Sequence, residues 1–263
     1  MTMLIGYKNY RDDILIAADS RITFSSSGRV IETRDELQKV YFFNEGIAVG
    51  FASNDISIVR NIFRIIKKEN SFDDDNNRFI GLLKQKSKNI RVSTSFILGI
   101  LKNGRNQLFS YTIINGEVKP KEIKSNEYML LGSAKSEGGD SLKKSVLDLT
   151  FGKPGYDIPT YVKWLTSSYA IWAEKNEMQT VGQLLYTVEG SDNYFGVIPY
   201  ETMIDTNSSI GNVSLEYDKE KNIFYQYNRM TGSRKDLLAI DRVSLKLLKH
   251  SCIFQWITKR NSR

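Results

Sequence analysis

Short apolar runs separated by polar turns dominate the first fifty residues. These runs are long enough for strands of a sheet and too short for helices. They cover residues 3–8, 14–18, 39–43 and 47–51, and a polar loop at 24–29 precedes Val30 and Ile31. The last two runs flank Asn44-Glu45-Gly46, whose residue types are typical of a hairpin turn. The runs are apolar at consecutive positions, so they predict a sheet that is covered on both faces.

Apolar residues recur at helical spacing after this first group of strands. The spacing predicts helices over 56–66, 78–88, 138–149 and 161–175. Strands return at 95–101, 107–114, 117–118, 128–133, 183–188, 194–198, 214–217 and 223–226. Strands and helices therefore follow one another in groups rather than one by one.

This grouped order differs from the regular alternation of a parallel α/β fold. It favours an α+β protein in which antiparallel sheets pack together with helices outside them, a four-layer α-β-β-α sandwich. No internal repeat or linker divides the chain, so we expect one domain over 1–241 with a C-terminal extension over 242–263. A helix docked on the domain is the simpler interpretation of that extension, and contact with a partner or a membrane surface is the alternative.

The charge of the chain changes which partners are expected. The net charge is +7, but the extension alone holds six Lys or Arg and no acidic residue. The remaining chain has 31 basic and 30 acidic residues, so no basic stripe for nucleic acid is expected in the domain. No apolar run is long enough to span a bilayer, and the first residues lack the pattern of a secretory signal. We therefore expect a cytoplasmic protein that binds neither nucleic acid nor membrane.

Two residue types that often carry chemistry are nearly absent. Cys252 is the only cysteine, which excludes an intramolecular disulfide framework and a thiolate zinc cluster. His250 is the only histidine, which excludes a multi-histidine metal site and makes a Ser-His triad a poor explanation of any activity. We expect no metal and no organic cofactor, and the base of any enzyme here is expected to be a group other than histidine.

Thr2 offers such a base because it follows Met1 directly. A small second residue commonly permits removal of the initiator methionine, which leaves threonine with a free α-amine. That amine has a pKa of about 7.7–8.0, so much of it is neutral near pH 7 and can accept the hydroxyl proton. N-terminal threonine chemistry therefore requires no histidine.

Asp19 and Lys39 stand at the ends of predicted strands. Asp19 follows the apolar run 14–18, and Lys39 opens the run 39–43. A lysine beside a nucleophilic hydroxyl favours its ionised form, and an aspartate can keep that lysine charged and oriented. The alternative interpretation is a surface ion pair worth about 0–1 kcal/mol.

Several short motifs together resemble those of the β-type subunits of proteasomes and their bacterial relatives. The motifs are Thr2-Met3-Leu4-Ile5-Gly6, Ile16-Ala17-Ala18-Asp19-Ser20-Arg21, Lys39-Val40 and Gly50-Phe51-Ala52-Ser53. A later segment, Leu131-Gly132-Ser133-Ala134-Lys135-Ser136, resembles the glycine-serine loop of that family. The family consists of N-terminal nucleophile hydrolases with an α-β-β-α sandwich and a threonine nucleophile.

The resemblance implies a role for each matching position. Thr2 would be both nucleophile and base, with Asp19 and Lys39 as its supporting pair. Ser133 would help to arrange the amine. The backbone amide of Gly50 would donate to the oxyanion.

One further motif of the family is matched with changes. The family usually has an aspartate, a serine three residues later and then two glycines. The nearest counterpart here is Glu177, followed by Thr180-Val181-Gly182. Glu177 and Thr180 are thereby expected to complete the surroundings of the amine. The resemblance also implies a homo-oligomer, a peptide or protein substrate and an ATP-dependent unfoldase as partner.

Two other functions are compatible with the same sequence. One is an inactive subunit that keeps the sandwich as a scaffold, an interpretation that the altered segment at Glu177 favours and the retained Thr2, Asp19 and Lys39 oppose. The other is acyl transfer, in which an amine instead of water takes the acyl group. The first half-reaction is the same for transfer and hydrolysis, so the residues alone leave both open.

Overall fold

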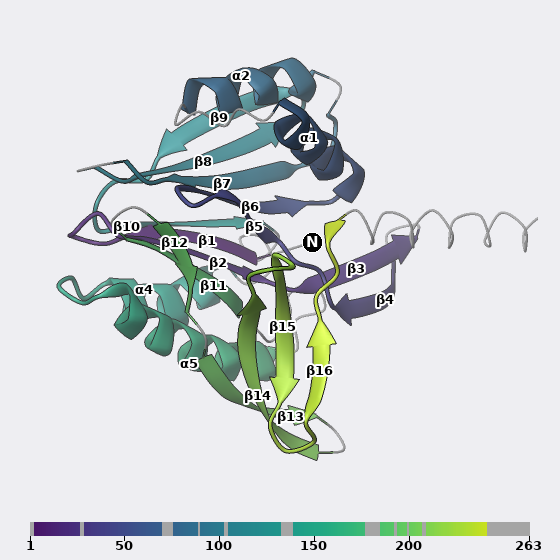
Figure 1. Ribbon diagram of the computed structural model, residues 1–263, viewed down its shortest axis with the longest axis vertical. Coiled ribbons are helices and arrows are strands. Elements are labelled where there is room, and N and C mark those ends of the chain that lie inside the picture. The colour runs from purple at the N-terminus through teal and green to yellow at the C-terminus, as the bar shows by residue number, and fades with distance from the viewer. Residues whose placement is uncertain are drawn as a thin grey trace, which may run out of the picture.

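The arrangement of the chain is seen in a computed structural model (Figure 1). It describes residues 3–26, 29–69, 76–88, 90–102, 105–132, 139–176, 185–191, 194–198, 200–206 and 209–240. The extension predicted at 242–263 lies outside these residues. Antiparallel sheets and helices make up the described chain, which confirms the expected α+β class.

The first sheet has β2 at its centre, between β1 and β11. Its strands in spatial order are β10 (Glu127–Gly132), β1 (Met3–Lys8), β2 (Ile14–Asp19), β11 (Leu185–Ser191) and β12 (Tyr194–Val197). All neighbours are antiparallel, and β1 and β2 are buried along their whole length. The continuous apolar runs seen in the sequence therefore correspond to strands covered on both faces, as predicted.

The second sheet follows the chain in simple order. Its strands are β5 (Val40–Asn44), β6 (Ile47–Ser53), β7 (Thr94–Ile100), β8 (Gln107–Ile114) and β9 (Glu117–Glu122). The predicted hairpin at Asn44-Glu45-Gly46 joins β5 to β6, and the side chain of Asn44 accepts the Gly46 amide at 2.9 Å. That hydrogen bond tightens the turn, which is the role expected of an asparagine there.

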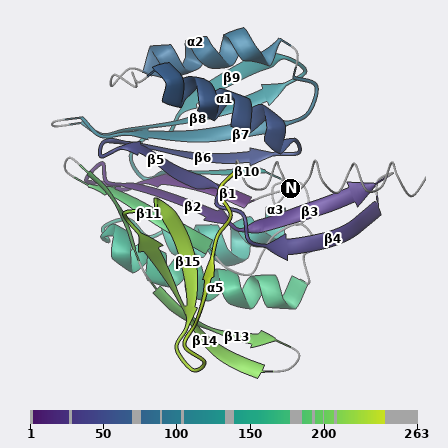
Figure 2. The ribbon, with the colours of Figure 1, turned by 45° about the vertical axis from the view of Figure 1, so that its right-hand side comes forward.

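Helices cover the outer faces of both sheets (Figures 1 and 2). Over the second sheet lie α1 (Ile56–Glu69) and α2 (Asn76–Ser87). Over the first sheet lie α3 (Gly139–Leu142), the π-helical segment η2 (Lys143–Leu147), α4 (Asp148–Phe151) and α5 (Ile158–Asn176). Each helix layer has its own apolar core, in which Phe63 and Phe79 pack on the second sheet and Tyr161 and Leu165 on the first.

A third apolar core joins the inner faces of the two sheets. Leu4 and Ile16 from the first sheet meet Val40 and Ile97 from the second. Alternate residues of β1 face opposite ways, so Met3, Ile5 and Tyr7 pack toward the helices while Leu4 packs between the sheets. The period of two in each strand thus divides its apolar residues between two cores.

Gly50 permits the close approach of the sheets at the centre of this core. A Cβ atom built on Gly50 would lie 2.6 Å from the Leu4 Cδ1 atom and 3.1 Å from the Ile16 Cγ2 atom. Both are closer than a normal carbon–carbon contact, and both neighbours are fully buried. The absence of a side chain at Gly50 therefore lets β6 lie against β1 and β2.

Two groups of strands differ from the prediction. The loop predicted at 24–29 is wrong, because β3 (Arg21–Ser26) and β4 (Arg29–Asp35) form a hairpin ladder that extends into it. The strands predicted at 214–217 and 223–226 belong to a separate sheet of β13 (Tyr200–Thr206), β14 (Ser209–Asp218), β15 (Ile223–Asn228) and β16 (Ser233–Asp236). Val213, Phe224 and Leu237 of this region pack into the core between the two large sheets.

Replacement of Gly50 by alanine should destabilise the fold. Its added methyl group must displace buried side-chain ends, so we expect the free energy of unfolding to fall by about 1–3 kcal/mol. Urea unfolding of the variant and the wild type measures this change.

Gly81→Ala is the matched control for Gly50→Ala. A Cβ atom at Gly81, inside α2, would have no atom within 4 Å. Alanine is preferred to glycine in a helix by about 1 kcal/mol, so this variant should be as stable as the wild type or more so. Equal stability of both variants would contradict the close-approach explanation of Gly50.

Candidate active site

Asp19 and Lys39 form a buried ion pair between the two large sheets. Asp19 is the last residue of β2, and Lys39 directly precedes β5. The Lys39 Nζ atom lies 2.9 Å from the Asp19 Oδ1 atom, and the two side chains are 1% and 0% exposed. The two residues are therefore in direct contact and their burial excludes a surface ion pair, while their part in a reaction stays a prediction.

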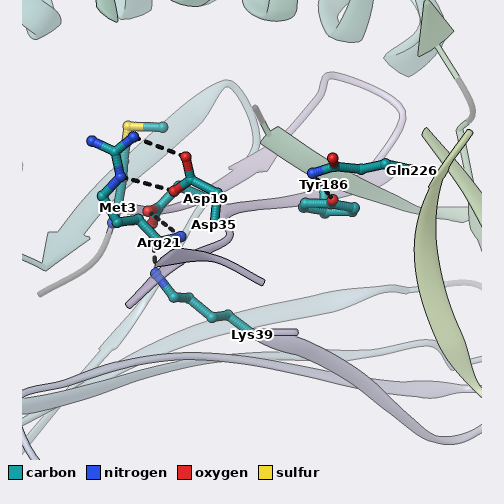
Figure 3. Close-up of polar contacts among 7 residues, drawn as sticks. All are labelled: Met3, Asp19, Arg21, Asp35, Lys39, Tyr186 and Gln226. Atoms are coloured by element: carbon teal, nitrogen blue, oxygen red, sulfur yellow. Dashed lines mark hydrogen bonds and ion pairs between the residues drawn. The ribbon is translucent and has the colours of Figure 1, made fainter. Parts of the chain in front are cut away.

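The same oxygen of Asp19 also contacts the start of the chain (Figure 3). The backbone amide of Met3 donates to Asp19 Oδ1 at 2.7 Å. Met3 is peptide-bonded to Thr2, and β1 lies beside β2 in antiparallel register. One carboxylate oxygen thus joins the Lys39 ammonium to the residue that follows the predicted nucleophile.

The second oxygen of Asp19 faces the base of the β3–β4 hairpin. The backbone amide of Arg21 donates to Asp19 Oδ2 at 3.0 Å. The Arg21 guanidinium in turn donates through Nε and Nη2 to the two oxygens of Asp35, each at 2.8 Å. Two ion pairs, Lys39 with Asp19 and Arg21 with Asp35, are therefore joined by the hydrogen bond from the Arg21 backbone amide to Asp19 (Figure 3).

Burial and these neighbours act in opposite directions on the Lys39 ammonium. Burial lowers the pKa of Lys39 below its usual value, because the charged form is separated from water. The negative charges of Asp19 and Asp35 raise this pKa, and the positive charge of Arg21 lowers it. The carboxylate of Asp19 is therefore the main group that favours a charged lysine at this position.

The strand pairing also places Leu131 and Gly132, the described residues of the glycine-serine segment, beside the first residues of β1. Gly132, the last residue of β10, is the register partner of Met3, the first residue of β1. Gly132 has a φ of 92°, a conformation that favours glycine. The predicted Ser133 is bonded to this glycine, but Thr2, Ser133, Glu177 and Thr180 all lie outside the described residues.

Gly50 lies in the middle of β6 rather than at a strand end. The next residue, Phe51, donates its amide to the Lys39 carbonyl at 3.0 Å, toward β5. Amides alternate in direction along a strand, so the Gly50 amide faces the other neighbour, β7. The structure gives this glycine a packing function, and its predicted role as oxyanion donor stays a prediction.

Sequence reasoning missed two partners of this cluster. Asp35 lies in a polar stretch, and only the cross-strand register of the hairpin pairs it with Arg21. Gln38 is buried, accepts the Phe224 amide and donates to the Asn222 carbonyl at 3.3 Å. Gln38 directly precedes Lys39, so these contacts connect the β13–β16 sheet to the segment that carries Lys39. Gln38 and Phe224 lie 186 residues apart in the sequence.

A cleft of about 970 Å³ lies elsewhere on the molecule, between β5, β12 and the β13–β16 sheet. Phe42, Phe195 and Tyr217 give it aromatic walls, and Glu216 and Arg229 give it charged groups. Of the predicted site residues that the structure describes, Asp19, Lys39 and Gly50, none lines it. The cleft is large enough for a small molecule, but its size alone defines no chemistry.

Three further findings bear on function. No helix in the described part of the chain has the length and apolar character needed to cross a membrane. Among the same residues, no three His, Cys, Asp or Glu side chains gather in a way that could hold a metal ion. Comparison with models of known protein families gives no match, and neither does comparison with curated proteins. The function is therefore inferred from the residues around Asp19.

Replacement of Asp19 by asparagine should destabilise the protein in a pH-dependent way. The variant leaves the buried Lys39 without its counter-charge, a change that costs about 3–5 kcal/mol near neutral pH. Burial already lowers the pKa of Lys39 in the wild type, and loss of the Asp19 charge lowers it further in the folded variant, so the variant gains more stability than the wild type as pH rises toward the unfolded-state pKa. The loss relative to the wild type should therefore shrink as pH rises from about 7 to about 10.

Urea unfolding at both pH values measures this difference between Asp19→Asn and the wild type. Glu117→Gln is the control, because it breaks the ion pair of Glu117 with Lys119 at the surface. The side chains of Lys119 and Glu117 are 60% and 72% exposed. We expect that control to change stability by at most about 1 kcal/mol at either pH. A penalty for Asp19→Asn as small as that of the control would show that the buried pair contributes little.

Proposed function

We propose that this protein is an amide-bond hydrolase that uses Thr2 as an N-terminal nucleophile after Met1 is removed. The observation that carries the proposal is the bridge made by Asp19. Its Oδ1 atom accepts from the Lys39 ammonium at 2.9 Å and from the Met3 amide at 2.7 Å. A buried cation is thereby held close to the residue that follows Thr2.

The architecture supports the same proposal. Two antiparallel sheets pack face to face and are flanked by helices on both outer sides (Figure 2). Such a stack is what the resemblance to proteasome β-type subunits implies. We infer that the chain has the fold of an N-terminal nucleophile hydrolase, with the β13–β16 sheet added to it.

The proposed reaction proceeds through an ester on Thr2. The α-amine accepts the hydroxyl proton, and the hydroxyl oxygen attacks the carbonyl carbon of a peptide bond. The carbon–nitrogen bond of the tetrahedral intermediate then breaks, and the leaving amine takes the proton from the α-ammonium. Water attacks the resulting ester, passes a proton through the α-amine to the threonine oxygen, and releases the acid.

Lys39 and Asp19 have complementary parts in this reaction. The ammonium of Lys39 stabilises negative charge on the attacking oxygen, which requires that the lysine stay protonated. Asp19 supplies the charge that opposes the effect of burial on the Lys39 pKa. Ser133, Glu177 and Thr180 are the proposed partners of the α-amine. Peptides or unfolded proteins are the proposed substrates.

The test is an intact mass measurement before and after treatment with a peptide epoxyketone. This electrophile captures a hydroxyl and an amine on the same residue. We expect a mass without Met1 and one adduct per chain. Thr2→Ala should abolish the adduct, because it removes the hydroxyl and keeps the amine.

Thr2→Ser is the matched control because it keeps both reacting groups, and it should still form the adduct. Thermal unfolding of both variants should resemble that of the wild type, which would show that a lost adduct reflects lost chemistry. A wild-type chain that retains Met1 and takes up no electrophile would overturn the proposal and favour an inactive scaffold.

A further inference from the structure

The ion pair of Arg21 and Asp35 closes the base of the β3–β4 hairpin. The two residues are register partners in that ladder, and their hydrogen bonds of 2.8 Å and 2.8 Å are bidentate. The Leu37 amide also donates to the Ser20 carbonyl at 2.9 Å, just outside the ladder. These contacts hold the two strands together at the base of the hairpin. The chain before the base carries Asp19, and the chain after it carries Lys39.

We propose that Arg21 and Asp35 are positioning residues that orient Asp19 and balance the charge around Lys39. The inference rests on the proposed function, because it assigns a part in that reaction to two more side chains. Neither residue needs to touch the substrate. Both act through Asp19, which receives the Arg21 amide at 3.0 Å.

The geometry of the Asp19 carboxylate supports the orienting role. Its Oδ1 atom accepts from Lys39 and Met3, and its Oδ2 atom accepts from Arg21. Rotation of the carboxylate would break all three hydrogen bonds. A bidentate arginine–aspartate pair has a defined planar geometry, so it fixes the start of β3 and with it the Arg21 amide.

The burial of the two pairs supports the balancing role. The side chains of Arg21 and Asp35 are 17% and 33% exposed, so water screens their charges only in part. Two negative and two positive groups lie in one series, and their formal charges sum to zero. The charges that act on Lys39 are Asp19 and Asp35, which favour its protonated form, and Arg21, which disfavours it.

A purely structural ion pair predicts a different outcome from a positioning pair. If the pair only closes the hairpin, loss of either member weakens the same contact and has the same effect. If the pair balances charge at the site, loss of Asp35 favours the neutral lysine, whereas loss of Arg21 favours the charged one. The two variants should then shift the pH dependence of the reaction in opposite directions.

The experiment measures the rate of adduct formation with the peptide epoxyketone between about pH 6 and about pH 10. Asp35→Asn and Arg21→Gln keep hydrogen-bonding side chains of similar size. We expect the profile of Asp35→Asn to move to lower pH and that of Arg21→Gln to move to higher pH. The ratio of the rates at pH 9 and pH 7 should change by about threefold in each direction.

Two kinds of control accompany these variants. Arg21→Lys and Asp35→Glu keep the charges but lose the bidentate fit, so they should react more slowly with the wild-type pH profile. If Asp35→Asn and Arg21→Gln fail to fold, these two variants test the orienting role instead, and a wild-type rate for both would refute it. Glu32→Gln removes a carboxylate from the same hairpin, where it pairs with Arg34, and should leave rate and profile unchanged.

The outcomes separate this inference from the proposed function. A wild type that forms no adduct refutes the proposed function, and the positioning role with it. A wild type that reacts, while Asp35→Asn and Arg21→Gln keep its profile or shift it in one common direction, refutes the positioning role alone. Opposite shifts together with an unchanged Glu32→Gln profile support it.

Discussion

The buried contact between Lys39 and Asp19 is the constraint on which this structure depends. An ammonium and a carboxylate lose their water when they are buried, and only close contact and further hydrogen bonds offset that loss. Here the carboxylate receives the Met3 and Arg21 amides in addition to Lys39. The starts of β1 and β3, the end of β2 and the residue before β5 must therefore meet at one point, which constrains how the two sheets face each other.

The apolar packing between the two sheets also brings Lys39 and Asp19 within reach of each other. Gly50 leaves room for Leu4 and Ile16, so the sheets lie close enough for a lysine from one to reach an aspartate of the other. The apolar core and the polar cluster are thus two parts of one arrangement. A change in the sheet separation would alter the contact between Lys39 and Asp19 as well as the packing.

The parts of this arrangement that depend on local pattern could be predicted from the sequence. Consecutive apolar residues indicated β1, β2 and β6, and the motif around Asp19 indicated its link to Lys39. The β3–β4 hairpin and the pair of Arg21 with Asp35 could not be predicted, because polar strands have little periodic signal and pairing depends on register. In the β13–β16 sheet only parts of β14 and β15 were predicted, and β13 and β16 were missed for the same reason.

The contact of Gln38 with the end of the described chain has a consequence for the order in which the site is built. Leu37 and Leu238 form an isolated parallel β-bridge, and the backbone amide of Gln38 donates to the Leu238 carbonyl at 3.1 Å. A ribosome releases the first strands long before residue 238. The segment that precedes Lys39 therefore lacks this backbone support until residue 238 has left the ribosome, long after Lys39 and Asp19 themselves.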